Sequence, residues 1–261
     1  MISGHVPPAA IPRVGATPPL AAVLFDAGLT LIRSATPTAV VAAEVLAAAG
    51  LEVHATDLER AMAAAESDLE ARWHGGDWWA SERSVRALFV HAYEAGLAGL
   101  PDVRLTPDRG ARLAAAMYEA YLDTRHWALF PDVLPALNAL RAAGIQMGVV
   151  SDWGHGLEAI LLELELGSYF EFLVVSSRLG VSKPSPHVFD MALGRIGVGP
   201  RQAIYVGDTY VKDVLGARSA GLTPVLLDRR GVAPPLDCIV IGSLAALLPL
   251  VGLGTSPDGG S

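Results

Sequence analysis

The residues Ala22-Val23-Leu24-Phe25-Asp26-Ala27-Gly28-Leu29-Thr30-Leu31 decide the fold of this chain. An apolar run that ends in an aspartate and a glycine turn is typical of a buried parallel strand. Ligands of open α/β sheets bind beyond the carboxyl ends of such strands. We therefore expect Asp26 to lie where chemistry is done, the alternative being an aspartate that only caps the following turn.

From Phe130 onward, short apolar runs alternate with helical patterns. Helices are expected over 133–143, 157–164, 187–196, 211–220 and 243–251, and strands over 146–150, 172–175, 203–206 and 224–227. Strands that alternate with helices indicate βαβ units. The sequence therefore predicts an α/β fold with a doubly wound parallel sheet.

The segment from 35 to 127 has a different pattern, with apolar residues spaced near 3.6 and few strand signals. Helices are expected over 36–50, 58–73, 81–96 and 106–121, with N-caps at Asp57, Ser81 and Thr106. We expect a core formed by 21–34 and 128–251, an inserted helical cap over 35–127, a disordered Pro-rich extension over 1–20 and a disordered tail over 252–261.

Composition narrows the possible functions. An apolar content of 52% with 18% charged residues indicates a globular protein, and no apolar run reaches the ~18 residues of a membrane span. A net charge of -8 without basic clusters argues against a nucleic-acid partner. Cys238 is the only cysteine, which excludes an intramolecular disulfide and fits a reducing cytoplasm. The first residues lack the basic start of a signal peptide.

Lysine is almost absent, because the basic residues are arginines except for Lys183 and Lys212. A lysine kept in such a chain is consistent with a need for its compact, mobile point charge.

Polar residues follow the predicted strands at their carboxyl ends. Asp26 and Thr30 follow the first strand, Ser151 and Asp152 the second, and Asp208 and Asp213 a later one, while Lys183 lies on a loop. Parallel strands bring these ends to one edge of the sheet. Neighbouring carboxylates would repel one another, and Mg²⁺ with its preference for oxygen ligands would remove that conflict.

Four segments carry a family resemblance in their order and spacing: 25–31, 149–152, 181–184 and 204–213. They resemble the motifs of the haloacid dehalogenase superfamily, in the branch with a helical (C1) cap between the first and second motifs. The resemblance covers about residues 20 to 250. It implies a hydrolase with catalytic residues Asp26, Lys183, Ser151 and Thr30. It also implies Mg²⁺ held by Asp26, Asp208 and the backbone carbonyl of Gly28, with Asp213 behind them.

Gly28 departs from the family pattern. Family phosphatases usually carry there a second aspartate, which protonates the leaving oxygen and then activates water. A replacement has to come from the cap, where two glycines and three tryptophans lie between 72 and 79. His74 or Asp77 could transfer the proton, and Trp78 and Trp79 could act as a lid that shapes specificity. Alternatively, the tryptophans pack the core of the cap and His74 is solvated.

Three functions remain open at this point. The first is a Mg²⁺-dependent phosphohydrolase that acts on a small phosphorylated metabolite through an aspartyl-phosphate on Asp26. The second is a 2-haloacid dehalogenase, in which Asp26 attacks carbon and a halide leaves without a proton, so that Gly28 costs nothing. The third is a binding or regulatory protein with weakened turnover, for which Gly28 is the only support.

Overall fold

The computed structural model describes residues 19–73, 75–101 and 103–253. His74, residues 1–18 of the expected Pro-rich extension and residues 254–261 of the expected tail lie outside the described residues. Next to those ends, Leu20 and Leu253 pack against the core.

Six parallel strands form the central sheet, in the order β5-β4-β1-β6-β7-β8. Their bounds are Ala22–Phe25 (β1), Gln146–Ser151 (β4), Leu173–Val175 (β5), Ala203–Gly207 (β6), Thr223–Leu227 (β7) and Ile239–Ile241 (β8). The predicted parallel sheet is confirmed. The sequence missed β8, an edge strand in which Ile239 and Val240 are exposed, because no helix separates it from β7 and it lies outside the strand–helix alternation.

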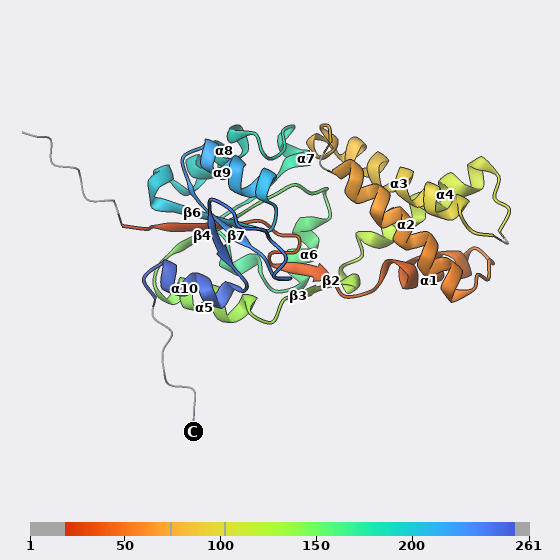
Figure 1. Ribbon diagram of the computed structural model, residues 1–261, viewed down its shortest axis with the longest axis horizontal. Coiled ribbons are helices and arrows are strands. Elements are labelled where there is room, and N and C mark those ends of the chain that lie inside the picture. Colours follow the sequence, from red (N-terminus) through yellow and green to blue (C-terminus); the bar gives the residue numbers. More distant parts are fainter. Residues whose placement is uncertain (1–18, 74, 102, 254–261) are drawn as a thin grey trace, which may run out of the picture.

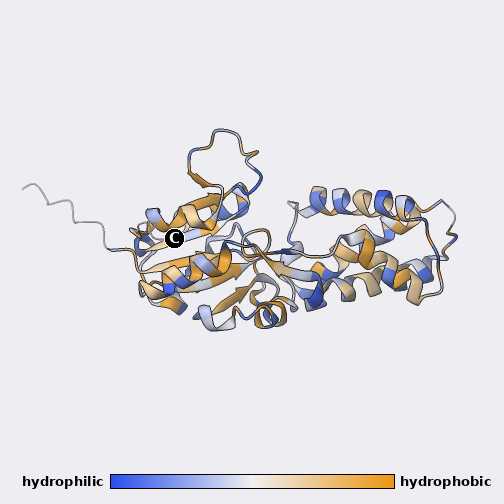
Figure 2. Cartoon of the chain, turned by 90° about the horizontal axis from the view of Figure 1, so that it is seen from below, coloured by the Kyte–Doolittle hydropathy of each residue, from blue (hydrophilic) through white to orange (hydrophobic). Residues whose placement is uncertain are grey.

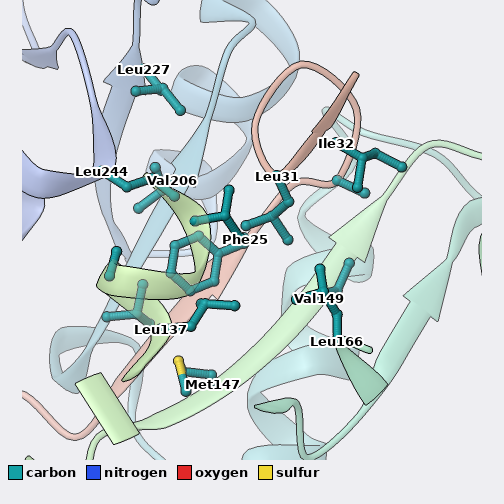
Figure 3. Packing of buried hydrophobic residues seen from close by; sticks show 14 of the residues in the cluster. Phe25, Leu31, Ile32, Leu137, Met147, Val149, Leu166, Val206, Leu227 and Leu244 are labelled. Atoms are coloured by element: carbon teal, nitrogen blue, oxygen red, sulfur yellow. The ribbon is translucent and has the colours of Figure 1, made fainter. Parts of the chain in front are cut away.

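Helices cover both faces of the sheet (Figure 1). On one face, α5 (Val133–Ala142), α6 (Leu157–Glu163) and α10 (Leu247–Leu250) pack against strand residues. Figure 3 shows Phe25, Val206, Leu137 and Leu244 meeting in this cluster. On the other face, α8 (Pro186–Ile196) and α9 (Gly216–Ser219) pack against Leu24 and Tyr205. A short helix, α7 (Ser176–Leu179), follows β5. Because neighbouring residues of β1 point to opposite faces, one strand contributes to both clusters.

Four further helices form a separate bundle beyond the sheet (Figure 1). They are α1 (Thr38–Ala48), α2 (Ala55–Trp73), α3 (Glu82–Ala98) and α4 (Pro107–Tyr121). The bundle has a hydrophobic cluster of its own, centred on residues such as Met62, Phe89 and Tyr118. Figure 2 shows hydrophilic residues along these helices and mostly hydrophobic residues along the strands of the sheet. No described helix combines the length and apolar character that a membrane crossing requires.

Two of the three expected N-caps are confirmed. The Ser81 hydroxyl accepts a hydrogen bond from the Ser84 amide at 3.1 Å, and Thr106 accepts one from the Arg109 amide at 3.4 Å. Asp57 was expected to cap α2, but the helix begins at Ala55 and Asp57 lies within its first turn. An acid there still interacts favourably with the helix dipole.

Strands, and not only helices, connect the bundle to the core. Chain segments β2 (Ile32–Ser34) and β3 (Trp127–Leu129) pair antiparallel, with Ser34 opposite Trp127. β2 ends before residue 35 and β3 begins at Trp127, so the strand pair lies at the two ends of the segment expected to be helical. Short 3-10 turns were also missed: Trp78–Ala80 (η1), Thr124–His126 (η2), Gly167–Tyr169 (η3), Pro200–Gln202 (η4) and Leu244–Ala246 (η6), the last forming the start of the helix expected over 243–251.

Candidate active site

Asp26 lies at the carboxyl end of β1, beside the end of β4. The two strands run parallel with Phe25 opposite Val149, which brings Asp26 next to Ser151. The Ser151 hydroxyl donates a hydrogen bond to Oδ1 of Asp26 at 2.9 Å, and both side chains are buried. The pairing of β1 with β4 thus brings together two residues that are 125 positions apart in the sequence.

Lys183 neutralises part of the acidic charge at this edge. Its ammonium donates to Oδ1 of Asp26 at 2.8 Å, to Oδ1 of Asp213 at 2.6 Å and to the Tyr205 hydroxyl at 3.1 Å. Burial by itself would lower the pKa of Lys183, but the carboxylates of Asp213 and Asp26 outweigh it and hold the pKa well above its usual value. Lys183 is therefore a permanent cation beside the candidate nucleophile.

Three carboxylates gather around this lysine. Oxygens of Asp26, Asp208 and Asp213 all lie within 4.8 Å of one another. Burial and the neighbouring negative charges raise the pKa of Asp26 to about 6 and that of Asp208 to about 8. One ammonium cannot balance three ionised carboxylates. The donor set fits a divalent cation that prefers oxygen ligands, as Mg²⁺ does.

A π-helix, η5 (Tyr210–Leu215), positions Asp213. The sequence predicted a regular helix over 211–220, but the Val214 amide bonds to the Thr209 carbonyl at 3.4 Å, five residues back. The Thr209 amide in turn donates to Oδ2 of Asp213 at 2.8 Å. A Cβ atom at Gly207 would collide with the Asp213 carboxylate, so the absence of a side chain permits this approach.

The space beside Gly28 is filled by an aromatic ring. A Cβ atom built on Gly28 would lie 2.8 Å from Cζ3 of Trp153. Trp153 is 4% exposed and stacks on Tyr121 of α4, with ring centroids 6.0 Å apart. The ring therefore packs between the loop after β1 and the helical bundle.

Comparison with known proteins identifies the family. The family model described as haloacid dehalogenase-like hydrolase matches residues 20–221. The chain belongs to this family of hydrolases. Haloacid dehalogenase-like hydrolase domain-containing protein 3 of Danio rerio is 36% identical over 153 residues, 59% of this chain and 58% of that protein. Glyceraldehyde 3-phosphate phosphatase of Methanopyrus kandleri is 40% identical over 132 residues, 49% of this chain and 56% of that protein. The matches thus span little more than half of either relative.

Solved structures agree with this assignment over more of the chain. The crystal structure of a 2-haloacid dehalogenase from Pseudomonas syringae pv. Tomato is 27% identical, with a TM-score of 0.60. It covers 89% of this chain, and the chain covers 97% of it. The haloacid dehalogenase-like hydrolase fold, helical bundle included, is therefore present.

The expected cap residues of this haloacid dehalogenase-like hydrolase occupy different environments. Trp79 is 2% exposed and packs inside the bundle, 4.5 Å from Trp73 between ring centroids, as the alternative interpretation of the tryptophans expected. Trp78 is half-buried against the same cluster. Asp77 reaches the core, where its Oδ1 accepts a hydrogen bond from the Ser182 hydroxyl at 3.3 Å. Asp77 thus contacts Ser182, the residue that precedes Lys183 in the sequence.

Thr30 is fully buried, and its hydroxyl has no hydrogen-bond partner among the described residues. Its backbone carbonyl accepts a hydrogen bond from Arg229 at 2.7 Å. Asp26, Ser151 and Lys183 are joined by hydrogen bonds, whereas Thr30 is not joined to them. A catalytic role for Thr30 therefore stays a prediction.

Sequence reasoning missed several contacts of this site. Glu82, the first residue of α3, accepts hydrogen bonds from the Ser177 hydroxyl and from Nδ1 of His155, the latter at 2.8 Å. Burial would raise the pKa of Glu82, but these hydrogen bonds lower it below its ordinary value. Nothing in the sequence pattern marked Glu82 or Tyr205. Lys212, whose ammonium lies 3.1 Å from Oδ2 of Asp152, was marked only by the scarcity of lysine.

Proposed function

We propose that this hydrolase is a Mg²⁺-dependent phosphohydrolase, acting on a small phosphorylated metabolite through an aspartyl-phosphate on Asp26. One observation carries the proposal: a buried aspartate bonded to Ser151 and Lys183 lies within 4.8 Å of two more carboxylates. Relatives named as phosphatases, including the Methanopyrus kandleri protein, support it. We further propose that the enzyme works in the cytoplasm on a soluble substrate.

The two oxygens of Asp26 have different environments in the described part of the chain. Both the Ser151 hydroxyl and the Lys183 ammonium donate to Oδ1, which leaves Oδ2 as the attacking oxygen. Oδ2 forms a bond to phosphorus while the bond between phosphorus and the leaving oxygen breaks. Water then attacks the aspartyl-phosphate, which releases inorganic phosphate and restores the Asp26 carboxylate.

The surrounding residues have separate tasks in this scheme. Lys183 balances charge on the transferred group, and Ser151 fixes the orientation of the Asp26 carboxylate. Asp26, Asp208 and the Gly28 carbonyl would hold Mg²⁺, with Asp213 behind them, and the ion would neutralise charge on the phosphate oxygens. Position 28 carries no acid that could protonate the leaving oxygen. We therefore expect the best substrates to be those whose leaving group departs without protonation, such as aryl or acyl phosphates.

Dehalogenation is the second candidate, and the likeness to the Pseudomonas syringae 2-haloacid dehalogenase favours it. In that reaction, Asp26 attacks carbon, the carbon–halogen bond breaks and halide leaves without a proton. Gly28 fits this chemistry. The three gathered carboxylates favour phosphate transfer, since a reaction without metal gives no reason to bring such acids together.

One screen separates the two candidates. The full chain is assayed with and without Mg²⁺ against p-nitrophenyl phosphate, alkyl phosphates and 2-chloropropionate. We expect Mg²⁺-dependent phosphate release that is abolished in Asp26→Asn and kept in Asp190→Asn, a matched change at an exposed position of α8. Release of chloride in the presence of chelator, without phosphate release, would assign the chain to dehalogenation. If neither phosphate nor chloride is released, the third function, a binding or regulatory protein, is favoured.

A further inference from the structure

Lys212 is buried almost as deeply as Lys183, and the mechanism above does not use it. The residue is 7% exposed, and its ammonium donates to Oδ2 of Asp152 at 3.1 Å. A desolvated ammonium with three donors is costly unless it is well paired. A single carboxylate contact is sparse for such a group.

The bundle completes the environment of this ammonium. Nζ of Lys212 lies 5.3 Å from the ring centroid of Trp79 and 5.7 Å from that of Trp73. Both distances fall within the ~6 Å range of a cation–π contact. The tryptophans belong to η1 and to the end of α2, whereas Lys212 and Asp152 belong to the core. Lys212 would therefore lose two of its contacts if the bundle moved away from the core.

Asp152 transmits this contact toward the candidate nucleophile. While Oδ2 faces Lys212, Oδ1 accepts a hydrogen bond from the backbone amide of Lys183 at 3.0 Å. The side chain of Lys183 in turn bonds to Asp26 at 2.8 Å. The Asp152 carboxylate thus links the Lys212 ammonium to the backbone of Lys183, whose side chain contacts Asp26.

The π-helix makes this arrangement possible. Within η5, the consecutive residues Lys212 and Asp213 are both buried, and each is a member of a different ion pair. Asp213 pairs with Lys183, and Lys212 pairs with Asp152. Turns of this wider kind are uncommon and are found frequently at functional sites.

We propose that Lys212 is a positioning residue, through which seating of Trp73 and Trp79 on the core holds Lys183 against Asp26. It acts through Asp152 and does not touch the substrate. The first test is kinetic and rests on the proposed function. Lys212→Met, Asp152→Asn and the double variant are assayed with p-nitrophenyl phosphate, and Arg60→Met, a change at an exposed residue of α2, serves as the control.

We expect Lys212→Met to lower kcat by about 10- to 100-fold with little change in KM, the range typical of residues that orient a catalytic group. If Lys212 acts through Asp152, the double variant is no slower than Asp152→Asn alone. A raised KM with unchanged kcat would instead make Lys212 a substrate ligand. A lower Tm with unchanged kcat would reduce it to a structural ion pair. Either result overturns the proposal.

The second test needs no activity, because the chain has only two lysines. Acetic anhydride is applied to the folded protein, and acetylation of each lysine is followed by peptide mass spectrometry. In the wild type, both lysines should react slowly. In Lys212→Met, Lys183 should react several-fold faster, since its loop is no longer held. In Trp73→Leu, which serves if Lys212→Met fails to fold, both lysines should react faster. Unchanged acetylation of Lys183 in a folded variant refutes the coupling even if the protein hydrolyses no phosphate.

Discussion

Trp153 and Gly28 fit together as ring and gap: a Cβ atom at position 28 would lie 2.8 Å from Cζ3 of the tryptophan. The missing acid of the first motif is therefore matched by an aromatic residue after the second motif. An aspartate introduced at position 28 has no room while this ring is in place.

The first prediction follows from that contact. Gly28→Asp alone should lower the free energy of unfolding by about 1–3 kcal/mol, as overpacked substitutions do, without a gain in turnover. Gly28→Asp combined with Trp153→Leu should turn over alkyl phosphates faster than Trp153→Leu alone, by up to ~10²-fold. Thermal melts and steady-state rates on one alkyl and one aryl phosphate check both parts. A gain in the single variant would show that the ring moves aside easily.

Mg²⁺ should stabilise the folded protein. Binding to the native state alone adds about 2.7 kcal/mol at a concentration of about 100 times Kd. Differential scanning calorimetry with Mg²⁺ and with chelator measures the shift in Tm. Asp208→Asn should remove most of the shift, whereas Asp190→Asn should keep it. An equal shift in both variants would place the ion elsewhere.

The stability of the metal-free protein should depend on pH with a defined sign. Burial and the neighbouring carboxylates raise the pKa of Asp26 to about 6 and that of Asp208 to about 8 in the folded protein, both above the ordinary value of 3.8. The folded state then binds more protons than the unfolded state between about pH 4 and 8, so stability falls as pH rises through this window. The Tm gain from Mg²⁺ should grow over the same range. Asp208→Asn should remove the decrease in the free energy of unfolding near pH 8. Urea unfolding at several pH values measures this dependence.

Glu82 should control how firmly the bundle seats on the core. Glu82→Gln replaces the charged acceptor that faces Ser177 and His155, at a cost of about 1 kcal/mol. We expect a larger radius of gyration in small-angle X-ray scattering and a KM raised several-fold. Glu59→Gln, at an exposed position of α2, should leave both unchanged. Identical scattering of the two variants would mean that other contacts suffice for seating.

The sequence predicted the sheet and the meeting of Asp26, Ser151 and Lys183, because parallel strands bring successive carboxyl ends to one edge. It predicted β5, which also has three residues, but not β2, β3 and β8, whose residues are mostly exposed or half-buried and lie outside the strand–helix alternation that marked the others. The π-helix was equally hidden, because its local sequence matches that of a regular helix.

Contacts between distant side chains could not be read at all. The fit of Trp153 beside Gly28 and the seating of Trp79 over Lys212 depend on how the bundle packs on the core. Only the composition drew attention to Lys212, because nearly all basic residues of this chain are arginines. The structure shows that both lysines are buried.

The pairing of β2 with β3 has a consequence for the modularity of this enzyme. Because Ser34 lies directly opposite Trp127, the chain leaves the core and returns to it at neighbouring points. Removing everything between these residues and closing the gap with a tight hairpin turn would leave the six-stranded sheet covalently intact. We expect the same junction to accept a foreign bundle, so that recombination exchanges the helices around Lys212 while Asp26, Ser151 and Lys183 stay in the chain.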